Sequence, residues 1–271
     1  MSQPDHILFL HIPKTAGSTL HTVIQRNYKK SEHYLYNGIR YPDHLFELPE
    51  QKRASIKVLK GHIPFGRHGQ LSEGTFEYFT MLRDPVARVI SHYNQLLRSK
   101  GHHFYAEWEK HQYTLEELMH NGKLIYLNDM MVRMISGKLY EPWDAIGEKE
   151  YQLALTNIDQ HFFLAGVQDH FDAFLLMLCD HYHWKYPYYR KQQVARAAQK
   201  KAIVTESTIA AIRAHNTYDQ RLYDLIKQKF EERVEAAGPE FAKRLKRFQS
   251  INTRIEKILN ALPFVPPPRG D

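Results

Sequence analysis

The stretch from Lys14 to Thr19 has the residue types and spacing of an anion-binding loop. It reads KTAGST, follows an apolar run at residues 7–10 and leads into a helical pattern of apolar residues. Ala16 and Gly17 let the backbone come close to a ligand, and the unpaired N–H groups at a helix start favour a phosphate. Lys14 adds a positive charge where a leaving oxygen would become negative. These features predict a phosphate site.

The order of residues in this loop argues against an ATP site. A P-loop of the ATP-binding type reads G-x-x-x-x-G-K-[ST], with the lysine after the last glycine. Here Lys14 precedes Gly17, and no first glycine is present. The loop can also be interpreted as an ordinary strand-to-helix turn in which Ser18 or Thr19 caps the helix. That alternative explains the glycine and the hydroxyls but leaves Lys14 without a role.

Two further segments end in side chains that could bind an anion or move a proton. His62 comes just after an apolar run at residues 55–60, and Arg83 directly follows another at residues 76–82. Ligands of open α/β sheets bind beyond the carboxyl ends of the strands, so both residues become candidates. An imidazole at this place can act as a base, although a loop histidine that only closes the strand end is the alternative. Ser91, two helical turns after Arg83, could share a second phosphate with the guanidinium.

These candidates require a sheet whose strands end at one edge. The strands are predicted at residues 7–10, 55–60 and 76–82. Residues 17–28 carry apolar side chains at helical spacing and should pack on the sheet. Asp84 followed by Pro85 predicts a second helix, because Asp is a good N-cap and Pro fits the first helical position. Asp84 is therefore interpreted as a cap and Arg88 as a surface or ion-pair residue. Alternating strands and helices indicate an α/β fold.

Composition sets the class of protein. The chain has 271 residues, a net charge of +7 and 43% hydrophobic residues, which suffices for one large domain with a full core. The basic excess suggests anionic ligands, although solubility alone would explain it. No apolar run is long enough for a membrane span, and no signal-peptide pattern opens the chain, so an intracellular protein is expected. The single cysteine, Cys179, is predicted to be a buried core thiol.

Two motifs together carry a resemblance to a known family. The segments HIPKTAGST, ending at Thr19, and LRDPVARVISHY, starting at Leu82, closely resemble the two signatures of sulfotransferases that use 3′-phosphoadenosine 5′-phosphosulfate (PAPS). Their spacing, with Gly61-His62 between them, is most similar to the heparan-sulfate 2-O-sulfotransferase-type branch and its bacterial relatives. Looser similarity continues through a later strand at residues 161–167, the helix after it and a closing helix around Asp219.

The resemblance implies a P-loop-like three-layer α/β/α fold with a mostly parallel central sheet. It implies that the 5′-phosphosulfate of PAPS is bound by Lys14, Thr15, Ala16, Gly17, Ser18 and Thr19. Arg83 and Ser91 would hold the 3′-phosphate, His62 would deprotonate the acceptor hydroxyl, and Lys14 would stabilise the leaving phosphate. Arg190, in a basic stretch reaching Lys201, would belong to a loop that closes over the donor. No metal is required, and a carbohydrate acceptor in a bacterial cytoplasm is expected.

The remaining segments divide the chain as follows. Residues 1–238 are predicted to form the sulfotransferase-like domain. Within them residues 99–150 are a helical insertion, a possible acceptor subdomain whose aromatics are more simply its own core. Residues 239–271 would form an amphipathic helix and a Pro-rich tail. Apolar residues recur there in steps of three and four with Asn252 among them, so residues 239–262 either form a homodimer or pack back on the domain.

Two other classes of function remain open at this point. A P-loop kinase would show magnesium-dependent ATP binding, against which the position of Lys14 argues. A non-enzymatic binder of anionic polymers such as heparin would show steep salt dependence and would not depend on Lys14 or Arg83. Nucleic acid is not the expected partner.

Overall fold

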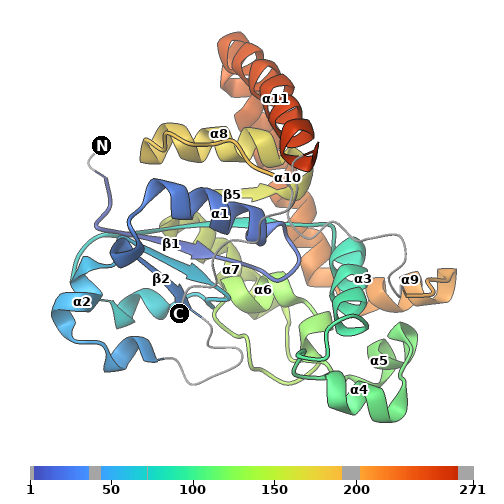
Figure 1. Ribbon diagram of the computed structural model, residues 1–271. Helices are drawn as coiled ribbons and strands as arrows, with labels where there is room; N and C mark the ends of the chain where they lie inside the picture. Colours follow the sequence, from blue (N-terminus) through green and yellow to red (C-terminus); the bar gives the residue numbers. More distant parts are fainter. Residues whose placement is uncertain (1–2, 37–43, 72, 191–201, 262–271) are drawn as a thin grey trace.

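The computed structural model describes residues 3–36, 44–71, 73–190 and 202–261 (Figure 1). Its centre is a sheet of five strands in the order β2-β3-β1-β4-β5, and every neighbouring pair is parallel. Because all strands run the same way, their carboxyl ends lie along one edge of the sheet. The strands are β1 (His6–Leu10), β2 (His33–Tyr36), β3 (Val58–Gly61), β4 (Phe76–Leu82) and β5 (Phe162–Val167).

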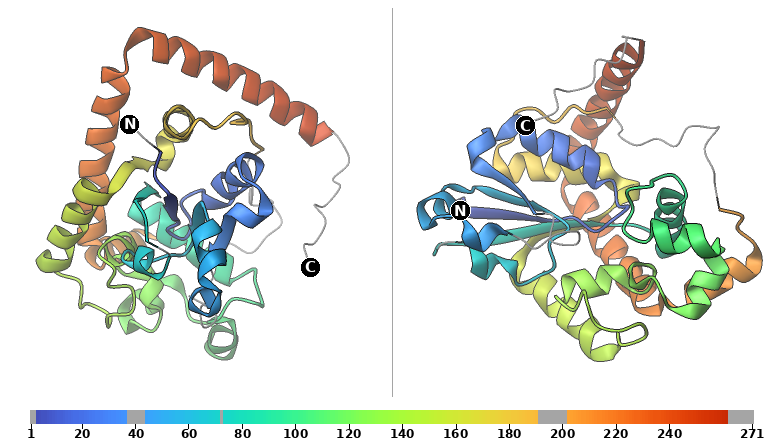
Figure 2. Two further views of the ribbon diagram at one scale, coloured as in Figure 1. Left: turned by 90° about the vertical axis from the view of Figure 1, so that its left-hand side faces the viewer. Right: turned by 60° about the horizontal axis from the view of Figure 1, so that its bottom comes forward.

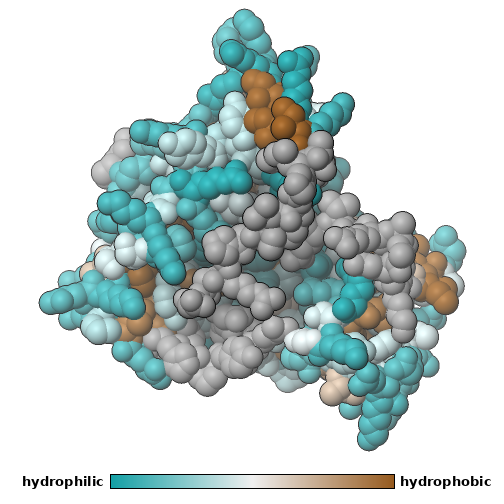
Figure 3. Space-filling view, viewed as in Figure 1, coloured by the Kyte–Doolittle hydropathy of each residue, from teal (hydrophilic) through white to brown (hydrophobic). Residues whose placement is uncertain are grey.

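Helices cover both faces of this sheet, which makes the predicted three-layer α/β/α fold correct (Figures 1 and 2). One face packs on α1 (Gly17–Asn27) and α8 (Phe171–Tyr182), and α11 (Gly238–Ala261) lies over α8 on its outer side (Figure 1). The other is covered by α3 (Pro85–Leu96), α6 (Met130–Ile135), α7 (Glu148–His161) and α10 (Thr217–Ala236). On the molecular face in Figure 3, the described residues are mainly hydrophilic.

Smaller elements fill the connections. The further α-helices are α2 (Glu50–Ser55), α4 (Tyr105–His111), α5 (Leu115–Asn121) and α9 (Glu206–Ala214). Short 3₁₀ helices lie at η1 (Lys30–Glu32), η2 (His44–Glu47), η3 (Arg67–Gln70), η4 (Ile125–Leu127) and η5 (Gln168–His170). Among the described residues, no helix has the length and apolar character needed to cross a membrane.

Three of the four predicted strands agree with the structure to within one residue, including β5, which was expected at residues 161–167 and begins at Phe162. β4 has the predicted bounds, and β1 begins one residue earlier than predicted. The run predicted to start at Ser55 is a strand only from Val58, because Ser55 ends α2. Asp84 caps α3 as predicted, since its carboxylate accepts a hydrogen bond from the N–H of Ala87 at 2.8 Å. Cys179 is buried as predicted.

The insertion at residues 99–150 is helical, and much of it is core. Trp108 and Tyr126 are buried in the cluster that also covers α3. Arg133 is fully buried and donates to the carbonyl oxygens of Asn128 and Glu141, so it holds the insertion together. Tyr140 is 57% exposed and contributes no comparable burial. For the two buried rings and Arg133, the core alternative is therefore the correct one.

The C-terminal helix packs back on the domain over its first half. α10 and α11 meet at a corner at Gly238, whose φ of +79° suits glycine (Figure 2). Phe241 and Phe248 are buried against the layer that contains α8. Asn252, expected either at a dimer seam or at a domain contact, accepts a hydrogen bond from the N–H of Tyr189 at 2.9 Å. A homodimer through residues 239–262 stays a prediction, and its last residue lies outside the described residues.

Candidate functional site

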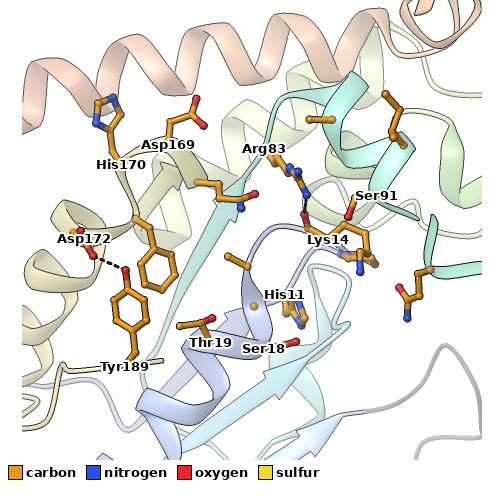
Figure 4. A pocket seen from close by; sticks show the side chains of 18 of the residues that line it. His11, Lys14, Ser18, Thr19, Arg83, Ser91, Asp169, His170, Asp172 and Tyr189 are labelled. Carbon is orange, nitrogen blue, oxygen red and sulfur yellow. Dashed lines mark hydrogen bonds between the residues drawn. The ribbon is translucent and has the colours of Figure 1, made fainter. Parts of the chain in front are cut away.

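A cavity of about 910 Å³ opens at the carboxyl edge of the sheet. Four strands contribute to it, because the segments after β1, β3, β4 and β5 all line its wall (Figure 4). The cavity therefore brings together nearly all residues singled out in the sequence. They are Lys14, Ala16, Gly17, Ser18, Thr19, His62, Arg83 and Ser91.

The loop after β1 has an unusual backbone. Lys14 and Ala16 have φ of +75° and +65°, a left-handed conformation that non-glycine residues seldom adopt. Ala16 is the N-cap of α1, and its methyl side chain forms no capping hydrogen bond. The alternative in which Ser18 or Thr19 caps it is therefore wrong, and both residues line the cavity instead. Strained backbone that presents an uncapped helix start to a cavity is suited to an anion.

Thr15 is the exception among the six loop residues. Its side chain is fully buried, and its hydroxyl donates to the carbonyl oxygen of Ile12 at 2.8 Å. Thr15 does not line the cavity. The expectation that Thr15 contacts the donor is therefore wrong for its side chain. The side chain instead fixes the shape of the loop.

Two cations stand next to each other at the mouth of the loop. The guanidinium of Arg83 donates from Nη1 to the carbonyl oxygen of Lys14 at 3.0 Å, which ties the end of β4 to the loop after β1. Burial, followed by the nearby charges of Arg98 and Arg83, lowers the pKa of Lys14 to about 8. Burial also lowers the pKa of Arg83. An anion bound between these groups would offset their desolvation.

His62 is held in a defined tautomer. Its Nδ1 lies 2.8 Å from the carbonyl oxygen of His11, and a carbonyl can only accept, so Nδ1 carries the hydrogen. In the neutral ring, Nε2 is then the nitrogen that can take a proton. His62 is partly exposed and lines the cavity. The geometry suits a general base.

His11 and His21 were not predicted as site residues. Nε2 of His21 lies 3.0 Å from Nδ1 of His11, whose ring stacks on His62 with centroids 4.6 Å apart. Burial is the main cause that lowers the pKa of His11 well below its usual value and that of His21 to about 3. Both rings are therefore neutral and act as packing and hydrogen-bonding groups. The sequence signal that could have identified His21 is its spacing of four from Gly17, which places both residues on the same face of α1.

Lys60 is a second residue missed by sequence reasoning. It lies in β3 two residues before His62, and only 1% of it is exposed. Its Nζ has no hydrogen-bond partner among the described residues. Burial lowers its pKa to about 8, and its charge in turn helps to lower the pKa of His21. Besides Lys14, a second amine is therefore buried close to the sheet edge that carries the site.

The far arm of the cavity has a different character. It is lined by Phe171 and Tyr189, together with Leu245 and Gln249 of α11. Tyr189 donates its hydroxyl hydrogen to Asp172 at 2.6 Å (Figure 4). Arg190, the next residue, does not line the cavity. Its assignment as a donor-binding residue is therefore not supported by the position, and the rest of its basic stretch, residues 191–201, lies outside the described residues.

Within residues 3–36, 44–71, 73–190 and 202–261, no three His, Cys, Asp or Glu side chains come together as a ligand set for a metal ion. Metal-independent chemistry stays a prediction.

A family model described as "Sulfotransferase family" matches residues 1–260. A search of curated proteins found no match. The match covers nearly the whole chain, including the loop, both flanking strand ends and almost all of α11.

Proposed function

Because the chain belongs to the sulfotransferase family, we propose that it transfers the sulfuryl group of PAPS to an acceptor hydroxyl. One observation carries the proposal. The uncapped loop with Lys14 lies between His62 on one side and Arg83 with Ser91 on the other, and all four line one cavity. A donor phosphorylated at two positions and a base for the acceptor are what such a cavity can accommodate.

The donor would be held at its two charged ends. The start of α1 and Lys14 would bind the 5′-phosphosulfate through N–H groups and a positive charge. Arg83 and Ser91 would bind the 3′-phosphate, the guanidinium through a charge-assisted hydrogen bond. Burial lowers the pKa of both cations, so pairing them with phosphates offsets a penalty that they carry in the free protein.

His62 would act as the general base. Its Nδ1–H is fixed by the carbonyl oxygen of His11, so Nε2 can accept the proton of the acceptor hydroxyl as the oxygen attacks sulfur. The stacked ring of His11 limits rotation of the base. A base placed in this way contributes roughly 10²- to 10⁴-fold to a rate.

Lys14 would stabilise the leaving group. Transfer between two oxygens in line leaves negative charge on the bridging oxygen of adenosine 3′,5′-bisphosphate, and the ammonium can lie beside it. Arg83 fixes the backbone of Lys14 through its hydrogen bond to the carbonyl oxygen. Positioning and charge stabilisation then account for most of the catalysis, as they do in phosphoryl transfer.

We infer that the acceptor is a carbohydrate hydroxyl. The resemblance to the carbohydrate branch supports this, and so do the many polar groups that line the cavity. A location in the bacterial cytoplasm stays a prediction.

Calorimetric titration of adenosine 3′,5′-bisphosphate tests the donor site. We expect micromolar binding to the wild type and loss of at least tenfold in affinity for Lys14→Ala and Arg83→Ala. Lys149→Ala, an exposed lysine on α7 outside the cavity, is the matched control and should bind normally. Preferential binding of ATP with magnesium would favour the kinase alternative. Heparin binding that is steeply salt-dependent and indifferent to Lys14 and Arg83 would favour the non-enzymatic one.

Turnover with PAPS tests the base separately. His62→Ala should bind adenosine 3′,5′-bisphosphate as the wild type does but lose about 100-fold or more in turnover. Full turnover in this variant, with donor binding retained, would remove His62 from the mechanism.

A further inference from the structure

The C-terminal helix reaches the cavity although it follows all the predicted motifs. Leu245 and Gln249, one turn apart on α11, line the wall of the far arm. They stand with Phe171, at the start of α8, and Tyr189. The rings of Phe171 and Tyr189 meet edge to face with centroids 4.8 Å apart. An aliphatic side chain, two aromatic rings and an amide therefore share this arm.

The strand order decides which substrate reaches this arm. His62 follows β3 on one side of β1, whereas β4 and β5 lie on the other side. Since neighbouring strands are about 4.8 Å apart, the end of β5 is roughly 10 Å from the loop after β1, in the direction away from His62. The reacting sulfur must lie between His62 and Lys14, so the acceptor occupies the β3 side. The nucleoside then extends across Arg83 toward β5.

We propose that α11 forms one wall of the subsite for the donor's purine base. Phe171 and Tyr189 offer aromatic surface for stacking, Leu245 adds apolar contact, and the Gln249 amide can hydrogen-bond to the edge of the ring system. The proposal rests on the proposed function and adds to it a base-recognition role for the C-terminal helix. A flat nitrogen heterocycle is the ligand class that combines these contacts.

The carboxylates of the arm do not oppose this ligand. Asp172 accepts the hydroxyl hydrogen of Tyr189 at 2.6 Å, and Asp169 accepts that of Tyr223 at 2.7 Å. Each carboxylate is thereby engaged with a tyrosine. A neutral base is better suited to this end of the cavity than a third phosphate.

Contacts with α8 and with residues 188–189 hold α11 over the arm. Asn252 accepts from the N–H of Tyr189 at 2.9 Å, and Phe248 stacks on Tyr188 with centroids 5.6 Å apart. Arg244 forms an ion pair with Asp180 of α8. The helix therefore positions Tyr189 and also supplies Leu245 and Gln249 to the cavity wall.

The test compares base-dependent and base-independent affinity by calorimetry. Adenosine 3′,5′-bisphosphate and uridine 3′,5′-bisphosphate are titrated into the wild type, Gln249→Leu, Leu245→Ala and Lys14→Ala. Stacking and edge contacts of a base are typically worth roughly 5- to 100-fold in affinity. We expect Gln249→Leu and Leu245→Ala to lose about 5- to 20-fold for the adenosine ligand and less for the uridine ligand. Lys14→Ala should weaken both ligands alike, because it contacts phosphate.

Ser250→Ala is the matched control, an exposed polar residue of α11 outside the cavity wall, and should bind both ligands normally. Thermal denaturation checks that every variant is folded. If the wild type binds adenosine 3′,5′-bisphosphate but the two α11 variants bind it with unchanged affinity, the inference is overturned while the proposed function stands. If the variants raise only the KM of the acceptor, the arm holds the acceptor and the inference is wrong. Absence of bisphosphate binding by the wild type would refute the proposed function itself.

Discussion

Replacement of Gly17 by alanine is the sharpest test of how the loop is built. A Cβ at this position would lie 1.9 Å from Nε2 and 2.0 Å from Cδ2 of the His11 ring, far inside any normal contact. The ring has little room to retreat, since it stacks on Phe9 at 5.3 Å and on His62 at 4.6 Å. Its Nδ1 is also held by His21. Either the loop or His11 must therefore move.

The size of the effect follows from this geometry. Overpacking a well-filled site costs about 1–3 kcal/mol, and loss of the His11–His21 hydrogen bond adds about 0.5–1.5 kcal/mol. For a chain of this size each kcal/mol lowers Tm by about 2–4 °C, so a decrease of roughly 3–18 °C is expected. Activity should fall further than stability, because a shift of about 1 Å in a positioning loop can cost about 100-fold in rate.

Thermal denaturation and turnover of Gly17→Ala measure both effects. Gly69→Ala is the control, since a Cβ there meets nothing within 4 Å, and it should change stability by less than about 0.5 kcal/mol. The double variant with His11→Ala separates steric cause from general damage. Its free energy of unfolding should be no lower than that of His11→Ala alone. The two substitutions would then be non-additive, with a coupling energy of about 0.5–3 kcal/mol. Wild-type stability and turnover in Gly17→Ala would refute the described contact between the loop and His11.

Three further predictions follow from the pKa values. Lys14, with a pKa of about 8, loses its charge as the pH rises through 8, so calorimetry should show weaker binding of adenosine 3′,5′-bisphosphate at pH 9 than at pH 7, with a smaller change in Lys14→Ala. Lys60→Met should stabilise the protein at pH 7 by about 1–3 kcal/mol in urea denaturation. Because the folded pKa of Lys60, about 8, lies below its unfolded value of 10.5, this gain shrinks as the pH rises from 8 toward 10.5, and a constant gain would contradict it. Burial raises the pKa of the Cys179 thiol to about 12, so a thiol reagent at pH 8 should label one group only after unfolding; rapid labelling of native protein would contradict its burial.

Local patterns predicted the elements that position the site. The apolar runs of β1 and β4 and the Asp84-Pro85 helix start depend on neighbours in sequence, and they were correct. Ser55 was misplaced because residues 50–54 have good helix propensity and α2 continues through Ser55. β2 was not predicted, since it is an edge strand with mixed burial and no clear alternation.

The candidate site divides in the same way. His62 and Arg83 could be found because each directly follows a strand, and Lys14 because it lies in the Gly/Ser/Thr loop after β1. The carboxyl ends of parallel strands meet at one edge, so these residues come together. The contact of His11 with His21, by contrast, exists only once α1 lies on β1. The α11 residues in the cavity depend on how a helix more than fifty residues downstream of α8 folds back. Arg190 was assigned from a basic stretch and the resemblance to a family loop, with no residue-level motif to fix its position.

The buried cations of the site lower the stability of the free protein but serve its proposed function. Burial lowers the pKa of Lys14, Lys60 and Arg83, so each destabilises the free protein relative to an apolar residue. Such groups persist in natural proteins mainly where function requires them, and substitutions that remove them raise stability at the expense of activity. A ligand with phosphates at two positions would recover this energy on binding. Lys14 lines the cavity, so Lys14→Met should weaken binding of adenosine 3′,5′-bisphosphate while it stabilises the fold.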